Sequence, residues 1–207
     1  MPKMAPKALK LTTKELSKSK WADLERLFSK PGIGDAWWCW CTFHHTASFT
    51  SENAPRTRAD RARVNRERKK ELVQKGEAHG VIVYADDGEP VGWSQYGPRE
   101  ELPRMDHTRS YRGISPPGEG SIWRITCFVV DKNYRRRGVA TAALRAVLES
   151  IKNKGGGVVE AYPVSKTDQG PGYMYSGRLS MFEKAGFKKA AQLGTGRTQT
   201  VLMRRKV

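Results

Sequence analysis

The sequence predicts an α/β (α+β) fold in one domain, with its elements in the order β-α-α-β-β-β-α-β-α-β-β. In some segments apolar residues occur at every second position, and in others they recur at helical spacing. This pattern predicts a mixture of strands and helices. The chain has 207 residues, which is enough to bury about 70% of its unfolded surface in one core. Its six tryptophans and 38% apolar content are typical of a folded protein and argue against extensive disorder.

The first elements follow a short basic segment. Residues 1 to 8 are predicted to form a flexible basic tail, and residues 9 to 207 the folded domain. Leu9 to Thr13 is expected to form the first strand. A helix is predicted over Lys18 to Phe28, because its large apolar residues share one face, and Pro31-Gly32 ends it.

A polar helix and a β-hairpin are predicted in the middle of the chain. The helix should run from Pro55 to Gln74, with proline at its start and so few apolar residues that most of it must face water. Gly80 to Ala85 and Pro90 to Tyr96 predict two paired strands, because Asp86-Asp-Gly-Glu supplies turn residues between two alternating runs. Gly97 to Gly120 is rich in proline, glycine and charge, and we expect an unusually long loop there.

A strand that leads through a basic turn into a helix is the most informative feature of the sequence. The strand ends in Cys127-Phe-Val-Val, the helix begins near Val139, and the turn between them carries three arginines and Gly138. The first N–H groups of a helix lack partners and carry partial positive charge, so they bind anions. Glycine lets the backbone approach a ligand closely. This segment therefore predicts a site for a phosphorylated cofactor.

The remaining elements complete the sheet. We expect a strand at Val158 to Val164, a polar loop through Gly172 and a helix over Ser176 to Ala185. Two closing strands are predicted at Phe187 to Gln192 and Gln199 to Met203.

The spacing Arg135-x-x-Gly138-x-Ala140 resembles the Arg/Gln-x-x-Gly-x-Gly/Ala signature of the GNAT superfamily of acyl-CoA-dependent N-acetyltransferases. Further along, Met181-Phe-Glu-Lys-Ala-Gly-Phe187 is similar to the late helix and following strand of that family. The resemblance covers roughly residues 80 to 190 and supports the motif through its context. It implies a GNAT-like single domain with a mixed, mostly antiparallel central sheet flanked by helices.

The resemblance also implies acetyl-CoA as co-substrate. Backbone groups of Phe128, Val129 and Val130 would pair with the pantetheine arm as though it were an extra strand. The pyrophosphate would be held by the turn and the start of the helix, that is by Arg135, Arg136, Arg137, Gly138, Val139, Ala140 and Thr141.

In this family the acceptor amine attacks the thioester directly, in a ternary complex. A tyrosine of the late helix protonates the departing thiolate in many members, but the matching position here is Phe182, which has no proton to give. Tyr175 and Tyr173 are possible replacements, although either could be an ordinary packed tyrosine. Glu160 could act as a base through water, or could lie on the exposed side of its strand.

The segment from Trp37 to Phe49 has no counterpart in the family signature. We predict that it forms an aromatic wall over the acceptor, with contacts from Trp38, Trp40 and His44, and that His44 or His45 could act as a base. A core-filling aromatic cluster is the simplest alternative. A zinc site is disfavoured, because structural zinc sites usually bring two short ligand pairs together, whereas Cys39, Cys41, His44 and His45 are crowded into seven residues. Cys127 is expected to be an inert core residue.

Charge and composition bear on partners and location. The formal net charge is +17, and the predicted helix after Pro55 and the C-terminal strands carry much of it, so the surface attracts polyanions. We favour a general role in solubility and in attracting CoA over a nucleic-acid surface. With no apolar run of about 20 residues, no membrane partner is expected. The absence of a signal-like apolar core near residue 1 and the sparse cysteines predict a cytoplasmic protein.

Three functions remain open for the acceptor side. The favoured one is acetylation of a primary amine on a small molecule. The second is acetylation of a protein or of aminoacyl-tRNA, gripped by the basic helix. The third is a catalytically silent module that binds CoA or nucleic acid, which Phe182 keeps open. The sequence does not decide the oligomeric state.

Overall fold

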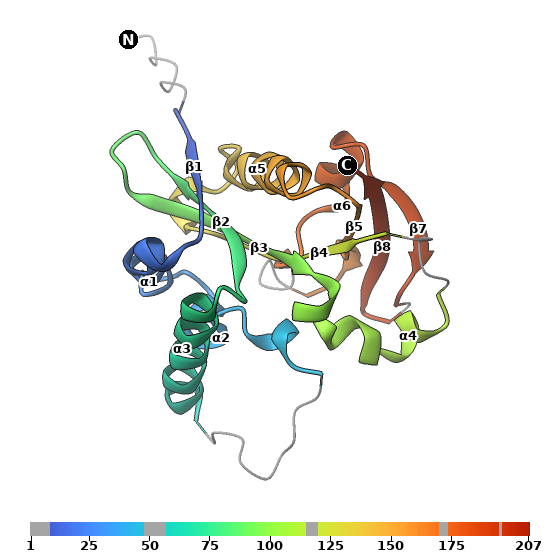
Figure 1. The fold of residues 1–207 in the computed structure, drawn as a ribbon, viewed down its shortest axis with the longest axis horizontal. Coiled ribbons are helices and arrows are strands. Elements are labelled where there is room, and N and C mark those ends of the chain that lie inside the picture. The colour runs from blue at the N-terminus through green and yellow to red at the C-terminus, as the bar shows by residue number, and fades with distance from the viewer. Residues whose placement is uncertain (1–8, 48–56, 115–119, 170–173, 195) are drawn as a thin grey trace.

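A single mixed sheet organises the chain. The computed structural model describes residues 9–47, 57–114, 120–169, 174–194 and 196–207, so the predicted tail at residues 1 to 8 lies outside the described part. Eight strands follow the order β1-β2-β3-β4-β5-β8-β6, with β7 paired to β8 (Figure 1). Among the described strands, β4 and β5 pair in parallel and the other pairs are antiparallel. The predicted mixed, mostly antiparallel sheet flanked by helices is confirmed.

The elements have the following bounds. The strands are β1 (Thr12–Glu15), β2 (His79–Tyr84), β3 (Pro90–Pro98), β4 (Ile122–Val130), β5 (Val158–Ala161), β6 (Val164–Thr167), β7 (Lys188–Gln192) and β8 (Thr198–Lys206). The α-helices are α1 (Trp21–Phe28), α2 (Ala36–Cys39), α3 (Arg58–Lys75), α4 (Arg109–Arg112), α5 (Val139–Asn153) and α6 (Leu179–Lys184). Short 3-10 turns are η1 (Lys18–Lys20), η2 (Phe43–His45), η4 (Arg99–Glu101), η5 (Pro103–His107) and η6 (Lys132–Tyr134).

The first strand lies three residues later than predicted. We expected Leu9 to Thr13, but β1 pairs with β2 from Thr12, opposite Tyr84, to Glu15, opposite Val81. Leu9 and Leu11 pack against the core without joining the sheet. The apolar side chains near residue 10 therefore indicate contact with the core, whereas the polar residues that follow them form the backbone pairing with β2.

Two predicted loops contain regular structure. Within the predicted loop, residues 99–112 form η4, η5 and α4, and Pro103 stands at the start of η5, where its missing N–H costs nothing. The polar loop expected after Val164 contains β6, which pairs with β8. The predicted strand from Val158 to Val164 is in fact divided, and Pro163, which cannot donate to a ladder, stands at the break.

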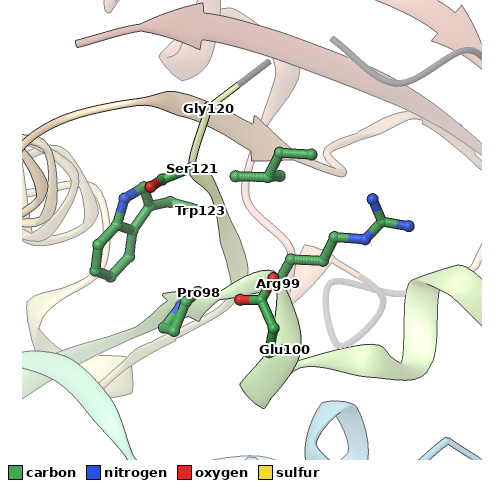
Figure 2. Close-up of a pocket in the computed structure, with 7 residues that line it drawn as sticks. Pro98, Arg99, Glu100, Gly120, Ser121 and Trp123 are labelled. Carbon is green, nitrogen blue, oxygen red and sulfur yellow. The ribbon is translucent and has the colours of Figure 1, made fainter. Parts of the chain in front are cut away.

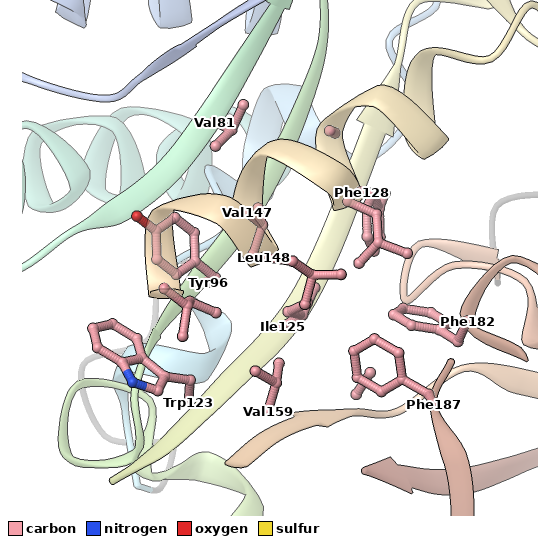
Figure 3. Close-up of a cluster of buried hydrophobic side chains, with 14 of the residues drawn as sticks. Val81, Tyr96, Trp123, Ile125, Phe128, Val147, Leu148, Val159, Phe182 and Phe187 are labelled. Carbon is pink, nitrogen blue, oxygen red and sulfur yellow. The ribbon is translucent and has the colours of Figure 1, made fainter. Parts of the chain in front are cut away.

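Helices cover both faces of the sheet. On one face α5 and α6 pack against the strands through a large apolar cluster, in which Phe128 of β4 contacts Phe182 of α6 with ring centroids 5.9 Å apart (Figure 3). On the other face α1, α2 and α3 cover a second cluster that includes Trp21, Trp40 and Trp93. The apolar residues of α1 and α5 recur at helical spacing, so each helix presents one stripe to the sheet. None of the described helices is both long and apolar enough to cross a membrane.

Gly80 on β2 makes room for the indole of Trp93 on β3. A Cβ at Gly80 would overlap that ring, which is 1% exposed and cannot move away. Replacing Gly80 by alanine should therefore lower the free energy of unfolding by about 1–3 kcal/mol, the usual cost of overpacking. Urea unfolding measures this. Gly113→Ala is the matched control, because a Cβ there meets no atom within 4 Å; equal losses in both variants would contradict the packing argument.

Candidate functional site

The sheet opens between β4 and β5. Their parallel pairing runs from Ile122 opposite Val158 to Ile125 opposite Ala161 and stops there, although β4 continues to Val130. In the described part of the chain, no strand pairs with the second half of β4 on the side away from β3. The backbone groups on that edge are therefore available to a partner other than a strand of the sheet.

A bulge lies at the point where the two strands part. Ile125 pairs with Tyr96 and Cys127 pairs with Gln95, so Thr126 is the extra residue. Two residues later the N–H of Phe128 donates to the backbone carbonyl of Tyr175, with N and O 2.6 Å apart. The free edge of β4 thus forms a hydrogen bond with the segment before α6, which brings the backbone of Tyr175 to β4, whereas Tyr173 lies outside the described residues.

The turn before α5 has the form of an anion site. Gly138 adopts a left-handed conformation with φ of 84°, and Arg136 before it has φ of 62°. No side chain caps the helix and its first turn holds no acidic residue, so the N–H groups at its start face no competing carboxylate. The N–H groups at an uncapped helix start lack intrahelical partners and carry partial positive charge, so they bind anions. The turn therefore fits a phosphate group.

The residues predicted to bind the cofactor differ in how far they are buried. Arg135, Arg136, Arg137, Gly138 and Thr141 are exposed at the turn, while Val130 and Ala140 are half-buried.

Phe128, Val129 and Val139 are buried in the core, so only their backbone groups can face a cofactor. These placements agree with a cofactor held mainly by backbone on β4 and by charge at the turn.

On the face covered by α1 to α3, polar residues from five elements (α2, η2, α3, β3 and β4) and from the turn after α2 meet behind the bulge. We call this group the thiol–lysine cluster; its members are Cys39, Cys41, His45, Lys69, Gln95, Thr126 and Cys127.

Lys69, at 0% exposure, is its most unusual member. The ammonium donates to Oε1 of Gln95 at 2.8 Å and lies 3.4 Å from Nε2 of His45, while the Gln95 amide donates to Oγ1 of Thr126 at 3.1 Å. A chain of hydrogen bonds thus joins α3 to the bulge in β4.

The hydrogen-bond partners of Lys69 in the described structure are uncharged, which affects its titration. Burial lowers the pKa of Lys69 to about 8. Burial, followed by the charge of Lys69, lowers the pKa of His45 to about 2, so this ring is neutral. Burial and the neighbouring Arg104 and Arg124 lower the pKa of His44 to about 3. Both histidines are therefore weak bases at neutral pH, which argues against the base role that the sequence suggested for them.

The aromatic segment divides between core and surface. Trp40 is 3% exposed and stacks on Trp21 with ring centroids 5.7 Å apart, so it fills the core and does not form part of an acceptor wall. Trp38 is half-buried and donates from its indole to Asp35. His44 is 8% exposed, and neither of its ring nitrogens has a hydrogen-bond partner in the described structure.

Glu160 lies inside a buried charge network. It is 0% exposed, so neither the exposed-face alternative nor free access to water holds. Its carboxylate accepts hydrogen bonds from Tyr111 at 2.6 Å, Tyr162 at 2.9 Å and Arg204 at 3.0 Å, and lies 3.7 Å from Nε of Arg124. These contacts tie β4, β5, β8 and α4 together directly before the strands part, which favours a structural role over that of a base.

Lys69, Gln95 and Thr126 were missed at the sequence level. Lys69 stands in a charged run, and the signal that could have indicated its burial is its position four residues before Val73, the other buried residue of α3. No group of three or more His, Cys, Asp or Glu side chains that could hold a metal ion is found among the described residues.

The structure also has a pocket of about 310 Å³ at the opposite end of β4 from the turn (Figure 2). Pro98, Arg99, Glu100, Gly120, Ser121, Ile122 and Trp123 line it. With a rise of about 3.3 Å per residue, the length of β4 puts this pocket roughly 25 Å from the turn. It is therefore separate from the anion site.

Comparison with known families decides the relationship. A model of the acetyltransferase (GNAT) family matches residues 36–170, which is more than half of the chain. The chain belongs to the GNAT acetyltransferase family. Comparison with curated protein sequences finds no match.

Solved structures of GNAT proteins share the fold. A putative acetyltransferase from Desulfovibrio desulfuricans has a TM-score of 0.54 at 17% identity, covering 95% of this chain and 99% of its own. An N-acetyltransferase from Staphylococcus aureus has a TM-score of 0.54 at 15% identity, covering 95% and 98%. An aminoglycoside acetyltransferase, solved with coenzyme A, has a TM-score of 0.53 at 17% identity, covering 95% of each chain. At these identities the likeness concerns the fold alone.

The charge network around Glu160 predicts the effect of a single substitution. Glu160→Gln keeps the shape but removes the counter-charge of Arg204, while Arg124 keeps its ion pair with Asp106, so the free energy of unfolding should fall by about 1–3 kcal/mol. Chemical denaturation measures the loss, and CoA affinity of the folded protein should stay unchanged. Glu149→Gln, at an exposed position of α5, is the control. Full stability combined with a collapse of acetyl transfer would instead identify Glu160 as the base.

Proposed function

We propose that this protein transfers an acetyl group from acetyl-CoA to a primary amine, by direct attack in a ternary complex. The observation that carries the proposal is the opening of the sheet after Ile125, which leaves the edge of β4 without a strand partner and leads into the uncapped start of α5. Membership of the GNAT family supports acetyl transfer in general. The donor, the acceptor class and the residue roles that follow are proposals.

The donor would bind along β4 and at the turn. The pantetheine arm would take the place of a strand beside Phe128, Val129 and Val130. This requires the N–H of Phe128 to exchange its bond with the Tyr175 carbonyl for one with the cofactor or the thioester oxygen. The pyrophosphate would meet the N–H groups from Gly138 to Thr141 and the adjacent arginines. These contacts would position the thioester near the bulge at Thr126.

The chemistry requires two proton transfers and one stabilised oxyanion. The neutral amine would attack the thioester carbon, the N–H of Phe128 would stabilise the oxyanion, and the C–S bond would then break. The departing thiolate would take a proton from Tyr175. Tyr175 is 50% exposed; its partial burial, with a smaller contribution from the neighbouring cysteines, raises its pKa, so the hydroxyl keeps its proton at neutral pH. The amine would lose its proton to water or to a group of the acceptor side.

A small-molecule acceptor is favoured by the covered face of the sheet. The segment around η2 contacts η5, and Asp106 of η5 forms an ion pair with Arg124 of β4. His44 in this cover is buried with both ring nitrogens unpaired in the described structure, which suits a polar group of an acceptor. Trp38 lies on the same segment. An aminoglycoside and histones are named as the acceptors of two proteins with a similar fold, so the fold does not choose between acceptor classes.

A protein or aminoacyl-tRNA acceptor is the second candidate. Its support is the exposed surface of α3, which carries Arg58, Arg63, Arg68 and Lys75. A polyanion held there would bind with steep salt dependence, whereas a small amine would not. A silent CoA-binding module is the third, and it predicts cofactor binding without turnover.

Arg135 tests the cofactor site. Replacing it by alanine should weaken CoA binding by roughly 10- to 100-fold, because a charged hydrogen bond to phosphate contributes about 1.5–3 kcal/mol. Isothermal titration calorimetry measures the affinity. Arg145→Ala, an exposed arginine farther along α5, is the matched control and should bind CoA as the wild type does. Equal affinity in both variants and the wild type would reject the turn as the pyrophosphate site.

Turnover tests the activity itself. Acetyl-CoA incubated with the protein and a panel of amines, peptides and aminoacyl-tRNAs should release free thiol with at least one small amine. Tyr175→Phe should slow this release by roughly 10²-fold or more while CoA affinity stays unchanged, because it removes the proposed acid. An unaffected rate would remove Tyr175 from the mechanism. CoA binding without release for any acceptor would support the silent module.

A further inference from the structure

Two cysteines from distant parts of the chain meet behind the cofactor strand. The sulfur of Cys41, in the turn after α2, lies 3.3 Å from the sulfur of Cys127 on β4, and both thiols are free. A disulfide needs a separation of about 2.05 Å, so a shift of little more than an ångström would join them. The two residues are 86 positions apart, so the fold creates this pair and chain proximity does not.

The backbone around Cys41 is held in an unfavourable conformation. Trp40 and Cys41 have φ of 50° and 51°, a left-handed region that residues with a Cβ rarely enter and that costs on the order of 1 kcal/mol each. Packing keeps them there, because Trp40 is fixed between Trp21 and Phe28. Two successive strained residues directly before the sulfur contact indicate that the position of Cys41 is maintained at a cost in stability.

Lys69 supplies a buried positive charge beside the pair. It is fully buried and, among the described residues, hydrogen-bonds to the uncharged side chains of Gln95 and His45. The Cys127 thiol and then the Lys69 ammonium lower the pKa of Cys41, against the opposing effect of burial. The pKa of Cys127 is raised by its contact with Cys41 and by burial. One thiol of the pair is thus activated and the other retains its proton.

We propose that Cys41 and Cys127, together with Lys69, form a peroxide-sensitive thiol pair that closes into a reversible disulfide. The Cys41 thiolate attacks one oxygen of hydrogen peroxide, the O–O bond breaks, and the released hydroxide takes a proton to give water. The sulfur of Cys127 then displaces the hydroxyl from the resulting sulfenic acid, and its proton leaves with that hydroxyl as a second water. Two thiols and one peroxide give one disulfide and two waters.

Cys39 is the competing thiol, and the structure disfavours it. Burial, with the neighbouring Cys41, raises the pKa of Cys39 to about 11, so little thiolate forms at neutral pH. The sulfur contact within hydrogen-bond distance joins Cys41 to Cys127. Cys41 is 3% exposed and Cys127 is half-buried, so the pair is open to solvent on the side of Cys127. The disulfide would bind the turn after α2 to β4, next to Phe128, and so couple the cover of the acceptor face to the cofactor strand.

Peptide mapping of the full-length protein tests the pair directly. The protein is treated with hydrogen peroxide, free thiols are blocked with an alkylating reagent, and the chain is cleaved on both sides of Cys41, including after Trp40, which separates Cys39 from Cys41. We expect a linked peptide containing Cys41 and Cys127, an alkylated Cys39, and loss of the link after treatment with dithiothreitol. A link through Cys39, alkylation of all three thiols, or oxidation beyond sulfenic acid without a link would overturn the proposal.

Matched variants separate the pair from its surroundings. Cys39→Ser should form the link as the wild type does, and Cys41→Ser should form none. Lys69→Met should slow the reaction roughly tenfold, because less Cys41 is then thiolate; Lys70→Met, the neighbouring lysine, is its control. Oxidation of Lys69→Met at the wild-type rate would overturn the role of Lys69. If a variant fails to fold, the peptide mapping of the wild-type protein still tests the proposal.

Discussion

The structure depends on the end of the pairing between β4 and β5. A strand that loses its neighbour halfway leaves N–H and C=O groups that need other partners, and burying them unpaired would cost about 1–3 kcal/mol each. The chain produces this edge with local means. Pro163 stands just past the end of β5, and the bulge at Thr126 marks the point of separation on β4. A cofactor arm with amide groups can form hydrogen bonds with these N–H and C=O groups as a strand would. The proposed function therefore depends on this edge.

Two buried polar groups hold the opening from either side. Directly before it, Arg124 and Glu160, which are opposite each other in the parallel register, join β4 and β5 through ionic contacts and tyrosine hydroxyls. Directly after it, the hydrogen bonds from Lys69 through Gln95 to Thr126 connect α3 to the bulge. Both groups lie in places where charge is costly, so we interpret them as supports that keep the strands apart at a fixed residue. The proposed oxidation of Cys41 and Cys127 by peroxide would affect the second of these groups, the hydrogen bonds from Lys69 to Thr126.

The sequence predicted the strands and the helix around the turn at Gly138 well because their signals are local. The hairpin, the strand before the turn and the helix after it each follow from spacing within a few residues, and Gly138, which the sequence places in the turn, has a φ of 84°. The acceptor half depends on contacts between distant segments. Period alone placed Glu160 on an uncertain face, Trp40 was expected at a surface that it does not reach, and Lys69 was hidden in a charged run. β6 was missed because its polar residues give little alternation.

A crystal structure of the complex with acetyl-CoA tests the central claim most directly. We predict that the pantetheine arm pairs with β4 at Phe128 to Val130, that the bond between Phe128 N–H and the Tyr175 carbonyl is replaced, and that the pyrophosphate lies at Gly138. A cofactor bound instead in the pocket beside Pro98 and Trp123, with the bond from Phe128 to Tyr175 intact, would contradict it.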